Sequence, residues 1–341
     1  MNENRALRRI RPRECIRLGE GMAMSRPPGE VLCLGLSPAL QRTVVLEGFA
    51  LGEVNRASRV VESAGGKSVT TARALSALGT AAQVCGFNGG PSGDQMVSHM
   101  VSEGLSARAL TNMVPSTRIC TTLIDRATGT ATELVEEAPD PGAAAIAQFM
   151  HDNVRRVRQA SMLVISGTLP PFVTDDFYMS FATEAAREEV PVLIDSHRAA
   201  LLNVLGEGPV LVKMTARELQ ATVRSPVDGE EQMLRAMRDL IAQGARAVLV
   251  THGGQTAYLM TPTTAWRLSP PTEQVRSVNP IGSGDCTSAG IAHALMSGEG
   301  LCESVRFGMG CGSANVETLI PADFDVRRAV DLARGVECDE I

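Results

Sequence analysis

From about residue 142 onward, segments with helical spacing alternate with short apolar segments, and this alternation constrains the fold more than any other feature of the chain. The segments with helical spacing are residues 143–158, 174–188 and 230–243. The short apolar runs are residues 162–165, 190–194, 210–212 and 247–250. Such alternation is typical of a parallel sheet with helices on both faces. The sequence therefore predicts an α/β fold with a doubly wound, mostly parallel sheet flanked by helices.

The first half of the chain adds a buried strand and two β-rich stretches. The run at residues 31–36 is continuously apolar, as expected for a strand covered on both faces. The β-rich segments about 41–63 and 116–137 predict a small β-sheet that serves as a lid. We expect residues 29–341 to form one domain and the arginine-rich residues 1–28 to be a disordered N-terminal extension.

Composition excludes several classes of protein. A net charge of −6 argues against a nucleic-acid partner, because such binding depends on neutralising phosphates. No apolar run reaches the roughly 18 residues of a membrane helix, so no membrane association is expected. The eight cysteines form no CxxC pair and have no zinc-site spacing. Reduced thiols and a cytoplasmic location are the expectation.

Lysine is nearly absent from this chain. It occurs only at Lys67 and Lys213, and the other 30 of the 32 basic residues are arginine. A lysine ammonium is a compact point charge, whereas the arginine guanidinium is a planar fork. The two positions that retain lysine are therefore candidates for functional cations.

A glycine-rich turn at residues 279–285 carries the strongest chemical signal. It reads Asn-Pro-Ile-Gly-Ser-Gly-Asp and runs directly into a helical segment. The free amides and dipole at a helix start favour a phosphate or a developing negative charge. Asp285 is either an ordinary helix cap or a base that accepts a proton from an attacking hydroxyl.

The turn belongs to a set of motifs that together resemble one family. Residues 279–290 resemble the C-terminal signature of the PfkB (ribokinase-like) carbohydrate kinases, closest to the 1-phosphofructokinase and tagatose-6-phosphate kinase branch. The further matches, in the family's order, are residues 63–79, 116–118, 132–137, 166–171, 213–219 and 250–254. The resemblance implies a ribokinase-like sheet with a small β-sheet lid, and an ATP- and Mg²⁺-dependent sugar kinase.

The resemblance also implies roles for individual residues. The catalytic group would be the base Asp285 with the amides of Gly282, Ser283 and Gly284. The nucleotide would be bound by Lys213, Thr215, Glu218, Thr251 and Gly253, with Glu218 holding Mg²⁺ through water. The substrate would be bound by Gln41, Gly65, Gly66, Lys67, Thr70 and Arg118. Two cations, Lys67 and Arg118, suit a sugar that already carries phosphate.

Three positions depart from the family pattern. Gln41 stands where the family has a sugar-binding aspartate, Thr70 replaces an asparagine, and Thr215 replaces the asparagine of Lys-Pro-Asn. Thr215 weakens the motif on the metal side, but the residues for phosphoryl transfer are mostly retained, whereas the sugar-binding residues are altered.

The leading hypothesis is a kinase of phosphorylated sugars of the fructose 1-phosphate or tagatose 6-phosphate type, with a homodimer formed through the lid. The alternatives are a kinase of unphosphorylated sugars or nucleosides, and a catalytically weak regulator that binds nucleotide or sugar phosphate. A P-loop is excluded because Val61 occupies the position of its first glycine.

Overall fold

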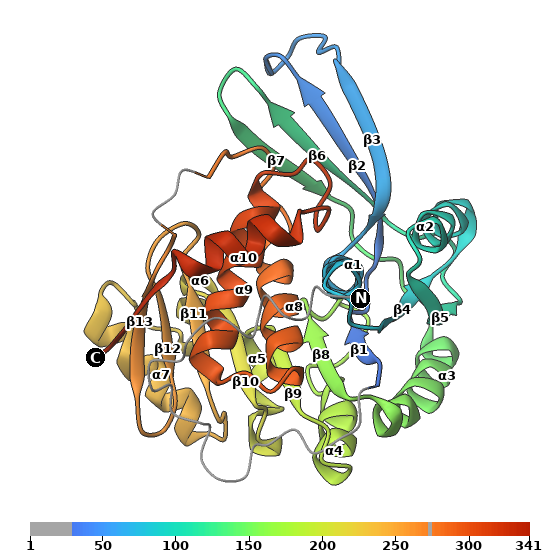
Figure 1. Cartoon of the computed structure of the whole chain (residues 1–341). Coiled ribbons are helices and arrows are strands. Elements are labelled where there is room, and N and C mark those ends of the chain that lie inside the picture. Colours follow the sequence, from blue (N-terminus) through green and yellow to red (C-terminus); the bar gives the residue numbers. More distant parts are fainter. Residues whose placement is uncertain (1–28, 272–274) are drawn as a thin grey trace.

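The computed structural model describes residues 29–271 and 275–341, which form a large sheet, a small sheet and flanking helices (Figure 1). The large sheet has ten strands in the order β14-β13-β12-β11-β10-β9-β8-β1-β4-β5. Its strands are β1 (Val31–Leu34), β4 (Ala82–Asn88), β5 (Ser106–Asn112), β8 (Met162–Ser166), β9 (Val192–Asp195), β10 (Leu211–Thr215), β11 (Val248–Thr251), β12 (Ala257–Met260), β13 (Ala265–Ser269) and β14 (Glu337–Glu340). The strands from β11 to β5 pair in parallel, which confirms the predicted mostly parallel sheet.

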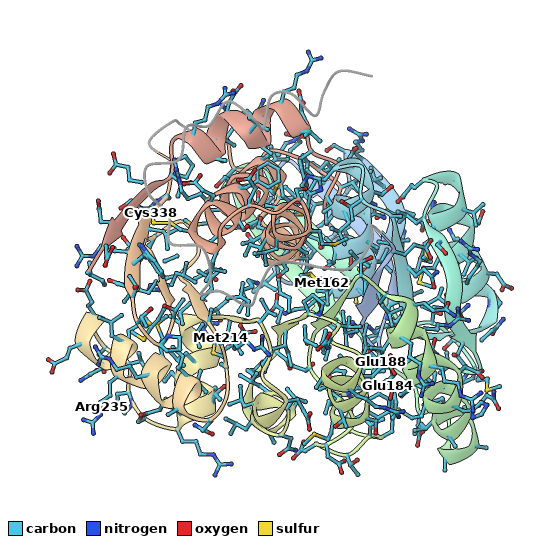
Figure 2. The ribbon with its side chains drawn as sticks, turned by 60° about the horizontal axis from the view of Figure 1, so that its bottom comes forward. Met162, Glu184, Glu188, Met214, Arg235 and Cys338 are labelled. Atoms are coloured by element: carbon cyan, nitrogen blue, oxygen red, sulfur yellow. A yellow bond between two sulfur atoms is a disulfide. The ribbon has the colours of Figure 1, made fainter. Side chains whose placement is uncertain are left out.

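Helices cover both faces of this sheet. One face packs against α1 (Lys67–Ala77), α2 (Gly90–Ser102), α8 (Ser283–Met296), α9 (Leu301–Val316) and α10 (Val326–Arg334). The other face packs against α3 (Ala143–Val154), α4 (Met179–Arg187), α5 (Arg198–Leu202), α6 (Ala216–Val223) and α7 (Glu230–Ala242). Because helices cover both faces of these strands, the strands are continuous apolar runs in the sequence. Met162 and Met214 in Figure 2 lie on two of these strands.

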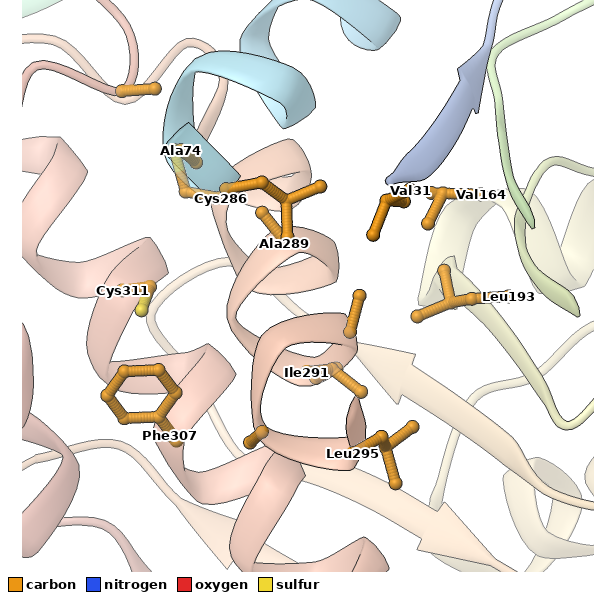
Figure 3. Packing of buried hydrophobic residues seen from close by; sticks show 14 of the residues in the cluster. Val31, Ala74, Val164, Leu193, Cys286, Ala289, Ile291, Leu295, Phe307 and Cys311 are labelled. Atoms are coloured by element: carbon orange, nitrogen blue, oxygen red, sulfur yellow. The ribbon is translucent and has the colours of Figure 1, made fainter. Parts of the chain in front are cut away.

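Helix α8 is buried on nearly all sides, which explains its small and apolar composition (Figure 3). Its partner α9 approaches so closely that a Cβ at Gly308 would lie 2.6 Å from the backbone oxygen of Thr287. A Cβ at Gly290 would likewise lie 2.8 Å from the Cα of Gly308. Only glycine permits this spacing, so the packing of the two helices holds the start of α8 rigidly.

The small sheet has four strands in the order β3-β2-β6-β7. These strands are β2 (Ala39–Leu46), β3 (Arg59–Gly65), β6 (Ile119–Asp125) and β7 (Thr130–Val135). It projects from the helical body beyond the start of α1 (Figure 1). Strand β3 leads through Gly66 directly into α1, so the small sheet is covalently joined to the large one at this point.

The structure also corrects several expectations. The helix expected over residues 174–188 begins only at Met179. Strands β12, β13 and β14 add an antiparallel edge that the helix–strand alternation did not reveal. These strands are short, and β13 and β14 are only partly buried, so their composition is mixed rather than apolar. Residues 1–28, expected to be a disordered extension, lie outside the described residues.

One cysteine pair departs from the expectation of reduced thiols. Cys302 at the start of α9 and Cys338 in β14 are joined in a disulfide, and Figure 2 labels Cys338. The five other described cysteines are free and buried. The helix α9 packs against β14, which brings two residues distant in sequence together. Within residues 29–271 and 275–341, no helix has the length and apolar character to cross a membrane.

Candidate active site

The sequence-predicted residues gather where the parallel strands of the large sheet end. Lys213 and Thr215 lie at the end of β10 and Thr251 ends β11, and beside them lies Asp195, which ends β9 and was not predicted. The order in which strands are added to the sheet reverses between the neighbouring parallel strands β1 and β8. From β1 the chain goes on to β4 on one side, and from β8 it goes on to β9 on the other. Crevices at such switch points are the usual ligand sites of open α/β sheets.

A buried carboxylate joins the two lysines of the chain. The Oδ2 atom of Asp195 accepts a hydrogen bond from Lys213 Nζ at 2.6 Å, and its Oδ1 atom accepts one from Lys67 Nζ at 3.4 Å. Asp195 is only 1% exposed. Burial alone would raise the pKa of Asp195, but the two ammonium groups outweigh it and lower the pKa to about 2. In turn, Asp195 raises the pKa of Lys67, so this cluster is charged at neutral pH.

The same aspartate contacts α8. Ser288 donates a hydrogen bond from Oγ to Asp195 Oδ2 at 3.3 Å. Residues three apart lie on the same face of a helix, so Ser288 and Asp285 face the lysine–aspartate cluster together.

The start of α8 forms a narrow turn that favours glycine. Gly282 has a φ of 82°, a left-handed conformation that side chains rarely adopt. A Cβ there would lie 2.8 Å from the Cβ of Pro321 and 3.0 Å from the Cγ2 of Thr70. A Cβ at Gly284 would lie 2.8 Å from Lys213 Nζ, so the ammonium group reaches the first turn of the helix. We call residues 282–284 the glycine turn.

Asp285 is 7% exposed at this helix start. Burial raises its pKa to about 7; the charges of Asp195 and Glu133 add to this effect, and Lys67 and Lys213 oppose it. Asp285 lies in the first turn of α8, whose N-cap Gly282 has no side chain to cap the helix. The carboxyl group is therefore poised to exchange a proton near neutral pH, as a general base requires.

Two of the residues predicted to bind the nucleotide, Thr215 and Glu218, also stabilise the start of α6. Thr215 caps α6, and its Oγ1 accepts from the amide of Glu218 at 3.2 Å. The carboxylate of Glu218 accepts from the Thr215 amide at 2.7 Å, which completes a capping box. The other carboxylate oxygen of Glu218 lies 3.6 Å from Nδ1 of His197.

Thr251 and Gly253 lie beside this pair. Thr251 pairs with Thr215 in the sheet register, and Gly253 adopts a φ of 56° in the turn that follows β11. A Cβ at Gly253 would meet no atom within 4 Å, so this turn leaves open space. The five predicted nucleotide residues thus lie at the ends of β10 and β11 and at the start of α6.

The described residues contain no group of three or more histidine, cysteine or acidic side chains that could hold a metal by themselves. Mg²⁺ needs no such cage, because it keeps several waters and binds through one or two carboxylates and nucleotide phosphates. Glu218 fits this requirement through the oxygen that is not engaged in the capping box. Asp195 is already engaged by two ammonium groups and by the hydroxyl of Ser288.

On the substrate side, Gln41 and Thr70 are more enclosed than expected. Gln41 is 4% exposed and donates a hydrogen bond from Nε2 to Thr122 Oγ1 at 2.9 Å. Thr70 is also 4% exposed, and its methyl group lies against the glycine turn. Gly65 and Gly66 form the junction between β3 and α1, where a Cβ at Gly65 would lie 2.7 Å from the Cβ of Gln41. At Gly66, which has a φ of 90°, a Cβ would lie 2.9 Å from the Cα of Pro38.

Arg118 is placed at the mouth of the site by backbone carbonyls. Its Nη2 and Nε donate to the oxygen of Ser37, at 2.8 and 3.1 Å, and its Nη1 donates to the oxygen of Glu136 at 3.3 Å. No carboxylate of the described chain forms a salt bridge with it. Its positive charge is therefore oriented by carbonyl groups and acts on Glu133, whose pKa is raised by burial and lowered in part by Arg118.

Three residues were missed from the sequence: Asp195, Glu133 and His197. Asp195 directly follows an apolar run, and a carboxylate at the end of a predicted parallel strand was the signal for it. Glu133 pairs with Thr122 across the small sheet, so both project from the same face of the sheet as Gln41. This face also affects Asp285, since Glu133 raises its pKa.

The raised pKa of Asp285 makes a prediction about stability. The folded protein holds this proton to about pH 7, whereas an unfolded aspartate loses it near pH 4. The contribution of this group to the free energy of unfolding is therefore lost progressively as the pH rises from about 4 to about 7. Asp285→Asn should be more stable than the wild type at pH 8, by roughly 2–4 kcal/mol, and nearly equal to it at pH 4. Urea unfolding at the two pH values measures this, and an equal effect at both would contradict the assignment.

Comparisons with known proteins identify the family of the chain. The sequence model of the pfkB family carbohydrate kinases matches residues 30–322. Phosphofructokinase-2 from Escherichia coli, solved in complex with fructose-6-phosphate, is similar in structure: the TM-score is 0.79 and the identity 25%, and 90% of this chain and 98% of that chain are covered.

Two other solved structures share the fold. A possible 1-phosphofructokinase from Thermotoga maritima has a TM-score of 0.84 at 22% identity, with 92% of this chain and 99% of that chain covered. Ribokinase from Arabidopsis thaliana, complexed with ribose and ATP, has a TM-score of 0.71 at 19% identity, with 91% and 99% covered. The match to the family spans most of the chain, and the chain therefore belongs to the pfkB family of carbohydrate kinases, as an ATP-dependent enzyme with the ribokinase-like fold.

Proposed function

We propose that this kinase transfers the γ-phosphate of ATP to a hydroxyl group of a phosphorylated sugar of the fructose 1-phosphate or tagatose 6-phosphate type. The observation that carries the proposal is the position of Asp285, a buried carboxyl group with a pKa of about 7 at the start of a glycine-lined helix. A base of this pKa is matched to proton removal from a hydroxyl at neutral pH.

The chemistry follows from the charges around this carboxylate. Asp285 accepts the proton of the attacking hydroxyl, and the amides of Gly282, Ser283 and Gly284 stabilise negative charge on the transferring phosphoryl group. Lys213, against Gly284, adds a positive charge beside the same amides. Mg²⁺, held by the nucleotide phosphates and reached by Glu218 through water, would neutralise phosphate charge.

A phosphorylated acceptor is supported by the cations of the substrate side. Lys67 is partly neutralised by Asp195 and lies close to the reaction centre. Arg118 has its Nε–Nη2 edge held by Ser37, and the remaining N–H groups of its two terminal nitrogens can donate to a phosphate. On the small sheet, Glu133 provides a carboxylate for sugar hydroxyl groups on the same face as Gln41, which has an amide in place of the family's aspartate. The similar phosphofructokinase-2 was solved with fructose-6-phosphate.

We further propose that the small sheet closes over the sugar as a lid and excludes water from the transfer. Its exposed apolar residues support pairing with a second copy of the chain through the lid. Val60, Leu134 and Val135 are 46%, 56% and 53% exposed, and Leu51 and Val54 at the β2–β3 connection are 89% and 82% exposed.

Two alternatives remain distinct in chemistry. A kinase of unphosphorylated sugars or nucleosides would have little use for the charge of Arg118. A catalytically weak regulator would bind nucleotide without releasing ADP, and Gln41 and Thr70 motivate it because both are enclosed by protein contacts.

The decisive test is ADP release with a panel of fructose 1-phosphate, tagatose 6-phosphate, fructose 6-phosphate, free sugars and nucleosides. Wild-type enzyme should turn over phosphorylated sugars, and Asp285→Asn should lower kcat by about 10²–10⁴-fold with the fold intact. Asp331→Asn, an exposed aspartate of α10, is the matched control and should leave kcat unchanged. Nucleotide binding without ADP release from any acceptor would favour the regulator.

Arg118→Gln separates the two kinase hypotheses. Loss of a charged phosphate contact should raise KM for a sugar phosphate by about 10-fold or more, with little change in kcat. KM for ATP should stay the same, because Arg118 lies on the substrate side. Highest turnover on a free sugar or nucleoside, with a KM that Arg118→Gln does not alter, would instead support the unphosphorylated acceptor.

A further inference from the structure

Arg73 is a buried arginine that no step of the proposed reaction uses. It lies on α1, two turns after Lys67, and its side chain is 9% exposed. Glu103, the C-cap of α2, holds it through two hydrogen bonds, from Nε at 2.6 Å and from Nη2 at 3.2 Å. The two terminal nitrogens also donate to backbone oxygens, those of Ala64 and Pro321.

The first of these oxygens belongs to the small sheet. The backbone carbonyl oxygen of Ala64 accepts a hydrogen bond from Arg73 Nη2 at 2.6 Å. Ala64 is the last residue but one of β3 and is followed by the substrate-side residues Gly65, Gly66 and Lys67. Arg73 therefore fixes the point at which the small sheet joins the large domain.

The second oxygen belongs to the loop that supports the glycine turn. Pro321 accepts from Nη1 at 3.0 Å, and its ring lies against Gly282, since a Cβ at Gly282 would lie 2.8 Å from the Cβ of Pro321. Asn315 holds the same loop, because its Oδ1 accepts from the amide of Ala322 at 2.7 Å. Its Nδ2 donates to the oxygen of Ile281 at 2.9 Å and to Ser283 Oγ at 3.0 Å.

The conformation of this loop is costly. Ala322 has a φ of 67°, which is unfavourable for a residue with a Cβ and persists only where surrounding contacts impose it. Arg73 and Asn315 supply such contacts, because Arg73 donates to the carbonyl oxygen and Asn315 accepts from the N–H of the peptide group that joins Pro321 to Ala322. The loop is thus held in one shape against the glycine turn.

We propose that Arg73 is a positioning residue that couples the end of β3 to the glycine turn, so that nucleotide bound at the turn restrains the base of the small sheet. A planar guanidinium fixes the separation of the two carbonyl oxygens that it bridges. A lysine at this position has one ammonium group, which cannot reproduce the fork. The inference rests on the proposed function, because it assumes that a nucleotide phosphate occupies the glycine turn.

Hydrogen–deuterium exchange of the full chain tests this coupling, with Mg²⁺ and the non-hydrolysable ATP analogue AMP-PNP as the probe. In the wild type, AMP-PNP should slow exchange of residues 281–286 directly and of residues 63–67 through Arg73, the latter by at least 5-fold. In Arg73→Lys, the slowing at residues 281–286 should persist, whereas exchange at residues 63–67 should stay within 2-fold of the nucleotide-free rate. Glu103→Gln is the matched control, since it retains both carbonyl contacts and should preserve the slowing at both segments.

The outcomes separate the two proposals. If the wild type fails to bind AMP-PNP, the proposed function is overturned and the coupling with it. If AMP-PNP binds but does not slow residues 63–67 in the wild type, the coupling is overturned alone, whether or not the variants fold. Slowing at residues 63–67 that survives in a folded Arg73→Lys protein would overturn it as well, because a purely structural arginine would give that result.

Discussion

The site depends on one ionic cluster, in which the buried Asp195 holds Lys67, predicted to bind the substrate, and Lys213, predicted to bind the nucleotide. Without this carboxylate, the buried ammonium group of Lys213 would lose its hydration uncompensated and would repel the half-buried ammonium group of Lys67. The cluster therefore allows two cations to stand close to the reaction centre. Because the lysines come from α1 and β10, it also ties together the two halves of the doubly wound sheet.

The cluster acts on the proposed base through charge and through position. Asp195 adds to the effect of burial on Asp285, while the lysines oppose it, and the balance leaves a pKa of about 7. Ser288 connects the same aspartate to the helix that carries Asp285. The tight contact between α8 and α9 then prevents that helix from shifting, so the carboxyl group and the glycine turn keep a fixed relation to each other.

Much of this arrangement could be predicted from the sequence, and the reasons for the exceptions are physical. The parallel sheet was evident because strands covered on both faces are continuously apolar, and the glycine turn was evident because a close backbone approach permits few residues. Lys67 and Lys213 stood out in a chain that otherwise uses arginine. In contrast, β14 is a short and largely exposed edge strand, which leaves no periodic signal.

Contacts between residues far apart in sequence were the hardest to foresee. Asp195 looks like an ordinary polar residue after a strand until both lysines are placed around it. Arg73 carries no motif of its own, and its partners come from residues 64, 103 and 321, which only the fold brings together. The capping box of Thr215 and Glu218 has a visible Thr-x-x-Glu pattern, so its local role could have been read from the sequence beside the proposed nucleotide role.

The pH dependence of kcat/KM in Asp195→Asn tests the central claim most directly. In the wild type, activity should fall below about pH 7, because Asp285 must lose its proton to act as a base. Removing the negative charge of Asp195 should move this fall to lower pH, even as kcat decreases, whereas Ser288→Ala, which removes only a hydrogen bond, should leave it in place. A fall that stays at the wild-type pH, or moves higher, in Asp195→Asn would contradict the account.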